Sequence, residues 1–425
     1  MEYNTDSAQR PSLGWFLVSA VISIFSLAGC NQTSASYLFE TQPQTPLAAV
    51  GLNSTRSPQI AVSAAGMISL LTLYQDGTNT RVGFTMSHDG GDHFMPVQAV
   101  SREGATISAH GENNPMMAVS SRAVYALWEQ TQHDGAKDLV VARSLNAGQT
   151  FEVPVRVNDN KTPSFHGFAS IAAGTNGEVY IAWLDGRDAP ESPGTFDIYL
   201  ARSTDRGATF GPNIRVARSG CPCCRPYVAL GKAGEVFVGW RKVFPGSIRD
   251  LVVSASKDGG QTFNRSTRVA EDGWQIPGCP ESGASLLFSK DRLYVAWMTG
   301  GADGRARIQL SWSDNGGADF HAPLKASDDV RDSNHAALSQ SEGSWILLSF
   351  QGRLASTSEA QWSKTSAFVV EVHGDKLGKP QALANDGMTA SYPGSAIGPD
   401  GNAFVVWSGT RERNNAVVLL RGRIR

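Results

Sequence analysis

One eight-residue pattern, Ser-x-Asp/Asn-x-Gly-x-x-Phe, recurs along the 425-residue chain and constrains its fold more than any other feature. The closing Phe residues of successive copies lie 57, 59, 53 and 57 positions apart. A period of about 56 residues is typical of a propeller or another array of like units, rather than of independent domains. The copies are residues 87–94, 144–151, 203–210, 256–263 and 313–320.

Each copy has the chemistry of a hairpin turn. The Ser and Asp or Asn side chains can bond backbone groups within the loop, and Gly can supply the positive φ that closes it. The five segments resemble the Asp-box (BNR) repeat of the sialidase superfamily. That resemblance implies a β-propeller in which the turns are structural and lie far from any ligand.

Around each turn lies a longer unit of three to four short strands. In one unit we expect strands at 169–173, 179–183 and 197–201, and in the unit before it a fourth strand at 153–157. The second strand of each unit carries a large aromatic residue. These residues are Tyr74, Trp128, Trp183, Trp240, Trp297, Phe350 and Trp407.

Seven units with no helix pattern after Gly29 predict an all-β propeller of seven blades, a single domain over 46–425. The 44 glycines and the low charged fraction of 18% agree, because they favour many turns over long surface helices. Six blades, usual in sialidases, are the alternative. The last unit ends after its third strand, at 416–421. A strand near 47–50 would complete it, close the ring and remove exposed strand edges.

An apolar run at 15–29 precedes these units, and it is shorter than the ~20 residues that span a bilayer. It ends in Leu-Ala-Gly-Cys at 27–30, which resembles a bacterial lipobox. This resemblance implies that 1–29 is a signal peptide, that Cys30 is lipidated and that 30–45 is a tether. We then expect a lipid-anchored protein at the outer membrane, in the periplasm or on the cell surface. A short N-terminal anchor helix is the alternative.

The net charge of the chain indicates which classes of partner it can bind. The chain has 37 Lys and Arg against 39 Asp and Glu, a formal charge of −2. Nucleic-acid binders usually carry a basic surplus, so we expect no nucleic-acid partner. We expect a monomer that binds a carbohydrate or another small ligand and touches the membrane only through its lipid.

The loops that lead into the first strands lie opposite the repeated turns and converge on the propeller axis. The sialidase resemblance implies a catalytic set at that face, since glycoside cleavage needs a proton donor and a nucleophile. The set is the nucleophile Tyr392, its carboxylate partner Glu281, the acid/base Asp76 and the carboxylate-binding Arg56. The chain departs from the family where Trp297 stands in place of an arginine. Two of the three guanidinium groups that would bind a sialic-acid carboxylate therefore have no match.

Four cysteines follow Cys30 and fall in the first-strand loops of two adjacent units: Cys221, Cys223, Cys224 and Cys279. In an oxidising compartment these predict disulfides. One bridge would join the two loops, and a vicinal bridge between Cys223 and Cys224 is a further option.

Metal binding is the second interpretation of these cysteines. His166 and His335 occupy equivalent loops of other units, and thiolates together with imidazoles would select copper(I) or zinc. No cofactor is required by any motif. Free, redox-active thiols are the third interpretation.

Three functions therefore stay open from the sequence. The favoured one is a ligand- or metal-binding protein that uses the Cys-rich loop face. The second is a divergent exo-sialidase or other glycoside hydrolase with a Tyr nucleophile. The third is an envelope scaffold that binds partner proteins through the same surface.

Overall fold

The computed structural model describes residues 55–424, except for 122, 189–193, 342–344, 357, 359–363, 384–386 and 412–413. Every element of this part of the chain is a β-strand apart from a three-residue 3-10 turn, Pro245–Ser247. The prediction of an all-β chain is confirmed.

By its internal contacts the chain divides into residues 1–36 and 37–425, and the described residues all belong to the second part. The expected signal peptide, lipidation site Cys30, tether 30–45 and closing strand near 47–50 lie outside the described residues. Within the described ranges, no helix has the length and apolar character needed to cross a membrane.

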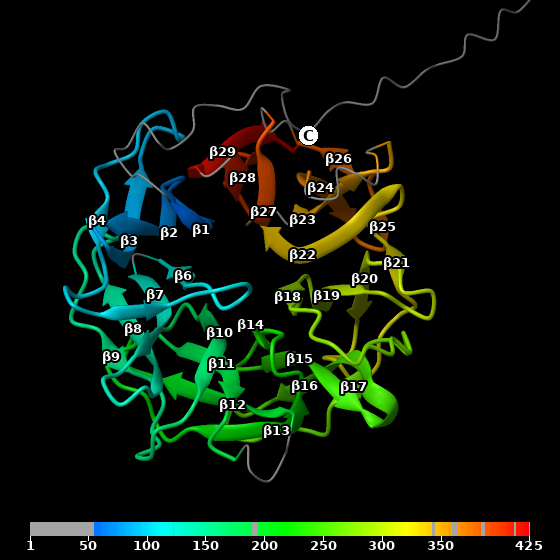
Figure 1. Cartoon of the computed structure of the whole chain (residues 1–425), viewed down its shortest axis with the longest axis horizontal. Coiled ribbons are helices and arrows are strands. Elements are labelled where there is room, and N and C mark those ends of the chain that lie inside the picture. Colours follow the sequence, from blue (N-terminus) through cyan, green and yellow to red (C-terminus); the bar gives the residue numbers. More distant parts are fainter. Residues whose placement is uncertain are drawn as a thin grey trace, which may run out of the picture. The chain divides into compact units, whose positions relative to one another are not determined.

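The strands pair antiparallel into sheets that follow one another along the chain (Figure 1). The first sheet contains β1 (Arg56–Val62), β2 (Ile68–Asp76), β3 (Asn79–Ser87) and β4 (Gln98–Ala99). The second contains β5 (Thr106–Ser108), β6 (Met116–Ser120), β7 (Ala123–Thr131), β8 (Lys137–Ser144) and β9 (Val155–Arg156). Here β5 and β6 pair with successive parts of β7, so together they occupy the place of one first strand.

An eight-stranded sheet follows and has two similar halves. The first half contains β10 (His166–Ala173), β11 (Val179–Asp185), β12 (Phe196–Ser203) and β13 (Ile214–Gly220). The second half contains β14 (Tyr227–Leu230), β15 (Val236–Phe244), β16 (Ile248–Ser256) and β17 (Thr267–Arg268). Pairing of Gly220 in β13 with Lys242 in β15 joins the halves.

Three further sheets complete the described chain. The first contains β18 (Ala284–Ser289), β19 (Arg292–Thr299), β20 (Arg307–Ser313) and β21 (Leu324–Lys325). The next contains β22 (Val330–Gln340), β23 (Ile346–Leu354), β24 (Ser366–His373), β25 (Lys376–Leu377) and β26 (Gln381–Ala382). The last contains β27 (Thr389–Ile397), β28 (Asn402–Arg411) and β29 (Asn414–Arg423).

The repeated eight-residue segments form the turns between third and fourth strands, as predicted. In the 203–210 copy, Ser203 Oγ donates to Asp205 Oδ1 (2.7 Å) and accepts the Gly207 N–H (2.8 Å). Asp205 Oδ1 also accepts the Thr209 N–H at 3.0 Å. Corresponding bonds recur in the other copies. The side chains thus satisfy the backbone of a tight loop.

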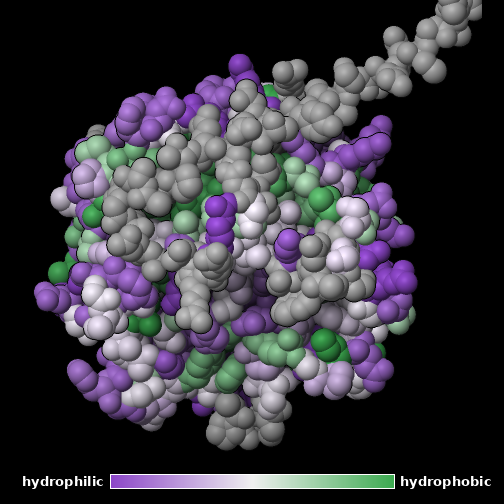
Figure 2. All heavy atoms as spheres, turned by 45° about the horizontal axis from the view of Figure 1, so that its top comes forward, coloured by the Kyte–Doolittle hydropathy of each residue, from purple (hydrophilic) through white to green (hydrophobic). Residues whose placement is uncertain are grey.

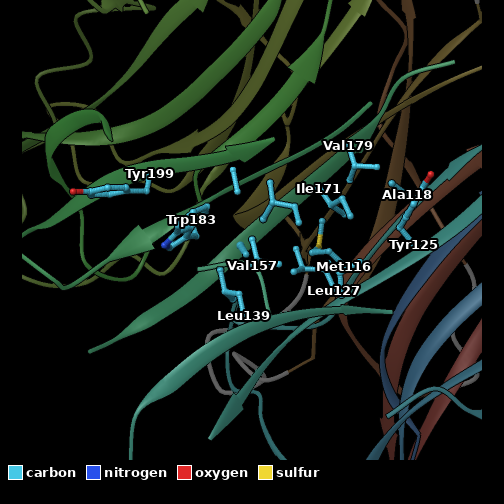
Figure 3. Packing of buried hydrophobic residues seen from close by; sticks show 14 residues of the cluster. Met116, Ala118, Tyr125, Leu127, Leu139, Val157, Ile171, Val179, Trp183 and Tyr199 are labelled. Carbon is cyan, nitrogen blue, oxygen red and sulfur yellow. The ribbon is translucent and has the colours of Figure 1, made fainter. Parts of the chain in front are cut away.

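The core lies between adjacent sheets, where the second-strand aromatics are buried. Tyr74 is half-buried, but the other six aromatic side chains are at most 2% exposed. Figure 3 shows one cluster, in which Met116 and Leu127 of the second sheet pack with Ile171 and Trp183 of the next. Truncating such a tryptophan to alanine would cost about 3–5 kcal/mol, because the void is only partly refilled.

The first and last described sheets are in direct contact (Figure 1). The Ser57 N–H donates to Ser408 Oγ at 2.7 Å, and the Val417 N–H donates to Thr55 Oγ1 at 3.0 Å. An apolar cluster lies between the two sheets. It contains Ile68 and Leu70 from the first and Phe404, Val406, Val417 and Leu419 from the last.

Candidate functional site

Five residues at the starts of first strands share an unusual backbone conformation. Four of them lie at register shifts in β1, β10, β22 and β27, and the fifth lies in the loop that leads into β18. Their φ angles fall between 48° and 55°, a region that costs energy for residues other than glycine. Such strain clusters at functional sites. The five are Ser57, Phe168, Glu281, His335 and Tyr392.

Glu112 joins three of the loops at this end of the sheets. Its carboxylate accepts the backbone N–H groups of Arg225 (3.1 Å) and Gly283 (2.8 Å) and lies 3.4 Å from His335 Nδ1. Burial alone would raise the pKa of this carboxyl. The hydrogen bond and charge of His335, with the charge of Arg225, instead hold the pKa below its usual range. Glu112 is therefore a buried carboxylate that ties the loops together.

The guanidinium of Arg225 is committed to the protein backbone. It donates to the carbonyl oxygens of Glu112 and Asn114, the latter at 2.9 Å. Burial lowers the pKa of Arg225, while the charge of Glu112 acts in the opposite direction. Both bonds come from Nη2, which anchors the 110–114 loop, while Nε is buried without a hydrogen-bond partner.

Tyr392 lies against His335 and near two carboxylates. The ring centroids of Tyr392 and His335 are 4.3 Å apart, and the Tyr392 N–H donates to Gln351 Oε1 at 2.8 Å. Burial raises the pKa of Tyr392 to about 12, and the charges of Glu281 and Glu112 raise it in the same direction. The phenol is therefore protonated at neutral pH.

Glu281 reaches across to the 110–114 loop. A Cβ on Gly111, whose φ is 51°, would lie 1.7 Å from Glu281 Oε1. The loop therefore needs glycine at this position for two reasons, its backbone angle and the space that the carboxylate occupies.

A small cavity of about 80 Å³ lies among these groups. Its lining includes Ser57, Glu112, Arg225, His335 and Tyr392. Sites for drug-sized ligands usually have volumes of roughly 300–1,000 Å³, so this cavity suits an ion or a few waters rather than a sugar ring. A larger cavity of about 580 Å³, lined in part by Lys290, Arg292, Trp345 and His373, contains none of the predicted site residues.

The cysteines form a second group at the same end. Cys223 and Cys279 make a disulfide with Cα atoms 6.2 Å apart, which confirms the predicted bridge between the two loops. Cys221 and Cys224 are free and buried, so the predicted vicinal bridge between Cys223 and Cys224 is wrong. The sulfur atoms of Cys221, Cys223 and Cys224 lie within 4.8 Å of one another.

The two free thiols differ in their electrostatics. The hydrogen bond from Cys224, together with the Cys223 N–H and the charges of Arg249 and Arg241, lowers the pKa of Cys221 to about 6 against the effect of burial. Arg249 Nη1 donates to Cys221 Sγ at 2.9 Å. Burial raises the pKa of Cys224, and its interaction with Cys221 adds to this. At neutral pH these shifts favour the thiolate on Cys221 and the thiol on Cys224.

The other predicted site residues lie apart from these groups. Asp76 is mostly exposed, pairs with Arg81 at 3.3 Å and does not line the small cavity. Arg56 begins β1 beside the lining residue Ser57. His166 is fully buried, with Nδ1 2.5 Å from the Lys137 carbonyl oxygen.

Neither predicted histidine joins the sulfur atoms. The group that lies within 4.8 Å contains the three cysteines and neither His166 nor His335. His335 instead contacts Glu112 and Tyr392.

Sequence reasoning did not single out Glu112 and Arg225. Both stand in polar first-strand loops, His-Gly-Glu-Asn-Asn at 110–114 and Cys-Pro-Cys-Cys-Arg at 221–225. The available signal was a Glu and an Arg at equivalent places of two non-adjacent units. Their contact spans 113 positions and emerges only when the sheets are arranged in space.

Neither a family model nor a curated protein sequence matches this chain. Among solved structures, a protein of unknown function from Dyadobacter fermentans is 15% identical, with a TM-score of 0.50 over 88% of this chain and 95% of that one. The intramolecular trans-sialidase from Ruminococcus gnavus, in complex with oseltamivir carboxylate, is 14% identical, with a TM-score of 0.47 over 91% and 97%. A Hadza microbial sialidase is 14% identical, with a TM-score of 0.49 over 71% and 66%. At these identities the likeness concerns the fold.

Proposed function

We propose that this chain is an extracytoplasmic, lipid-anchored protein whose sheets are the blades of a seven-bladed, sialidase-like propeller with Asp-box turns. Seven blades follow if the eight-stranded sheet counts as two. The contact between the first and last sheets supports closure of the ring. Replacing Cys30 by Ser should move the protein from the membrane to the soluble fraction. Retention in the membrane would contradict the lipid anchor.

On this fold we propose that the cysteine cluster binds a soft metal ion, copper(I) in preference to zinc. The observation that carries this proposal is that two free, buried thiols, Cys221 and Cys224, belong to a group of sulfur atoms that lie within 4.8 Å of one another. Among the described residues it is the one group of three or more His, Cys, Asp or Glu side chains close enough to share an ion. Thiolates favour copper(I) and zinc, but zinc sites usually take four ligands. With Cys223 in a disulfide, Cys221 and Cys224 supply two thiols, which suits copper(I).

The test compares the native and denatured masses of the Cys30→Ser chain after anaerobic loading with copper(I). We expect a copper-sized increment in the native spectrum, and its loss in Cys221→Ser and Cys224→Ser. The double variant Cys223→Ser with Cys279→Ser is the matched control: it removes the disulfide without freeing a third thiol, leaves both proposed ligands and should keep the increment. No increment in the parent chain, or an equal one in Cys221→Ser, would refute copper binding at this cluster.

A glycoside hydrolase is the second candidate function. It is favoured by the position of Tyr392 beside two carboxylates, Glu281 and Glu112. The raised pKa of the phenol, the small volume of the cavity and the bonds of Arg225 Nη2 to backbone carbonyl oxygens count against it. Turnover of a sialoside that is lost in Tyr392→Phe would establish it. A scaffold would show neither metal nor turnover, and would instead co-purify with an envelope protein.

A further inference from the structure

We propose that the four cysteines form a thiol–disulfide exchange site, in which the buried pair Cys221 and Cys224 can take over the disulfide bond from Cys223 and Cys279. This activity goes beyond metal binding and does not require a metal. Its result would be a free thiol on Cys279, the one cysteine of the four that is exposed.

The attacking and attacked sulfur atoms are already in contact. Cys221 Sγ lies 3.8 Å from Cys223 Sγ, which is one half of the disulfide. Exchange proceeds when a thiolate attacks a disulfide sulfur, so this contact is the one that the first step needs. Arg249 Nη1 also donates a hydrogen bond to Cys221 Sγ at 2.9 Å, so a charged donor contacts the attacking sulfur.

The backbone can also accommodate the final bond. The Cys224 N–H donates to the Cys221 carbonyl oxygen at 3.4 Å, which makes 221–224 a four-residue turn with Pro222 in its second place. In a β-turn the first and fourth Cα atoms lie less than ~7 Å apart, and disulfides usually span about 4.4–6.8 Å. The two cysteines have the Cys-x-x-Cys spacing that redox-active pairs use.

The reaction balances without an external oxidant. First, the Cys221 thiolate attacks Cys223 Sγ; the Cys221–Cys223 bond forms, the Cys223–Cys279 bond breaks, and Cys279 leaves as a thiolate. Next, Cys224 gives up its proton and attacks Cys221 Sγ. The Cys221–Cys224 bond forms, and Cys223 leaves with the electron pair and takes that proton. One dithiol and one disulfide are consumed, and one of each is formed.

The cysteines of this exchange differ in their exposure to solvent. Cys221, Cys223 and Cys224 are at most 8% exposed, so an external protein or peptide thiol cannot readily reach them. Cys279 is exposed in the same disulfide. The exchange would therefore connect an interior dithiol to a surface thiol that can react with a dithiol or disulfide substrate outside the protein.

The test uses the full Cys30→Ser chain in buffer with a chelator. The chelator removes copper, so the exchange is measured independently of metal binding. Free thiols are labelled with a maleimide in timed pulses, quenched in acid and mapped by mass spectrometry. We expect Cys279 to become labelled while a Cys221–Cys224 disulfide appears. In Cys221→Ser the labelling of Cys279 should slow by ~10-fold or more, because the attacking sulfur is absent. Cys224→Ser should still label Cys279, but should accumulate the Cys221–Cys223 intermediate.

Equal labelling of Cys279 in the parent chain and in Cys221→Ser would overturn the proposal. Should Cys221→Ser fail to fold, Arg249→Gln serves as the second variant, and we expect it to label Cys279 several-fold more slowly than the parent. Circular dichroism of each variant checks the fold. Loss of copper binding with exchange intact would refute only the metal proposal, and the reverse result would refute only the exchange.

Discussion

Two sets of residues with left-handed backbones lie at opposite ends of the sheets, and they differ in which side chains they carry. Each repeated turn has two consecutive left-handed residues. The second is glycine in all five copies, and the first is glycine in three copies, Gly90, Gly259 and Gly316, with Ala147 and Arg206 in the other two. At the first-strand starts the left-handed residue is Ser57, Phe168, Glu281, His335 or Tyr392 in five units, and Gly111 is left-handed in the loop of the second unit.

In the repeated turns only the backbone conformation of the residue matters, whereas at the first-strand starts the side chain matters as well. A turn only has to reverse the direction of the chain, and glycine can adopt the left-handed conformation there without a steric penalty. At the first-strand starts the side chains of Ser57, His335 and Tyr392 line the small cavity. Strain of about 1–3 kcal/mol per residue is retained where the surroundings over-determine the conformation, as at a binding site.

The largest loss of stability should follow a substitution of a residue that lines the small cavity. Glu112→Ala removes the carboxylate that compensates the buried Arg225 and leaves the backbone N–H groups of Arg225 and Gly283 without an acceptor. We expect a loss of about 3–5 kcal/mol in the free energy of unfolding, measured in urea. Glu152→Ala, which removes an exposed partner of Arg143, is the control and should cost about 0–1 kcal/mol. Similar losses in both variants would remove the distinction between the two ends.

A smaller effect is expected in a repeated turn. Ser203→Ala removes the buried hydroxyl that accepts the Gly207 N–H and donates to Asp205. Leaving that N–H unpaired should cost about 1–2 kcal/mol. Thr204→Ala changes the neighbouring exposed residue and should leave the unfolding midpoint nearly unchanged. If Thr204→Ala cost as much as Ser203→Ala, the hydroxyl would not be what stabilises the turn.

The same turn should confer a pH dependence. Hydrogen bonds from Thr209 and Ser203 lower the pKa of Asp205 to about 2. A carboxyl with a lowered folded-state pKa stabilises the protein above its unfolded pKa of about 3.9, and this contribution is lost as the pH falls towards about 2. Because Asp205 is exposed, we expect at most about 1 kcal/mol. Urea unfolding between these pH values should be less pH-dependent in Asp205→Asn; an unchanged slope would contradict this.

The smallest effect tests the glycine preference itself. Ala147→Gly should stabilise the protein by at most about 1 kcal/mol, since it relieves a left-handed alanine but frees the unfolded chain. Gly259→Ala at the matching position should destabilise it by a similar amount. Thermal unfolding of the two variants should shift in opposite directions. Shifts of the same sign would show that neighbours, and not φ, decide the residue.

The sequence predicted the turns and the strand core because these depend on local chemistry. The Ser, Asp and Gly spacing of the repeated pattern contains all the partners of the turn, so no distant residue is needed. The second-strand aromatics were found by their period alone. The bridge between the Cys223 and Cys279 loops was also predictable, because both loops begin a first strand in neighbouring units.

The cavity could not be predicted in the same way. Glu112, Arg225 and His335 come from loops that are far apart in sequence, and no spacing rule relates them. His166 illustrates the limit: its position in its unit is similar to that of His335, yet its ring contacts the Lys137 carbonyl oxygen of the preceding sheet instead of Glu112 and Tyr392. Equivalent positions share a backbone environment, but side-chain direction and neighbours differ from unit to unit.

The contact between the first and last sheets has a consequence for how the chain acquires its structure. The apolar residues Ile68 and Leu70 have their partners more than 330 positions later, at Phe404 to Leu419. Contacts of such long sequence separation slow folding, because chain entropy must be lost before they form. During synthesis the apolar face of the first sheet would stay exposed until the last sheet has left the ribosome. Chaperone binding or transient aggregation should therefore involve mainly residues 56–87. It should end only when strands β28 and β29 have packed against them.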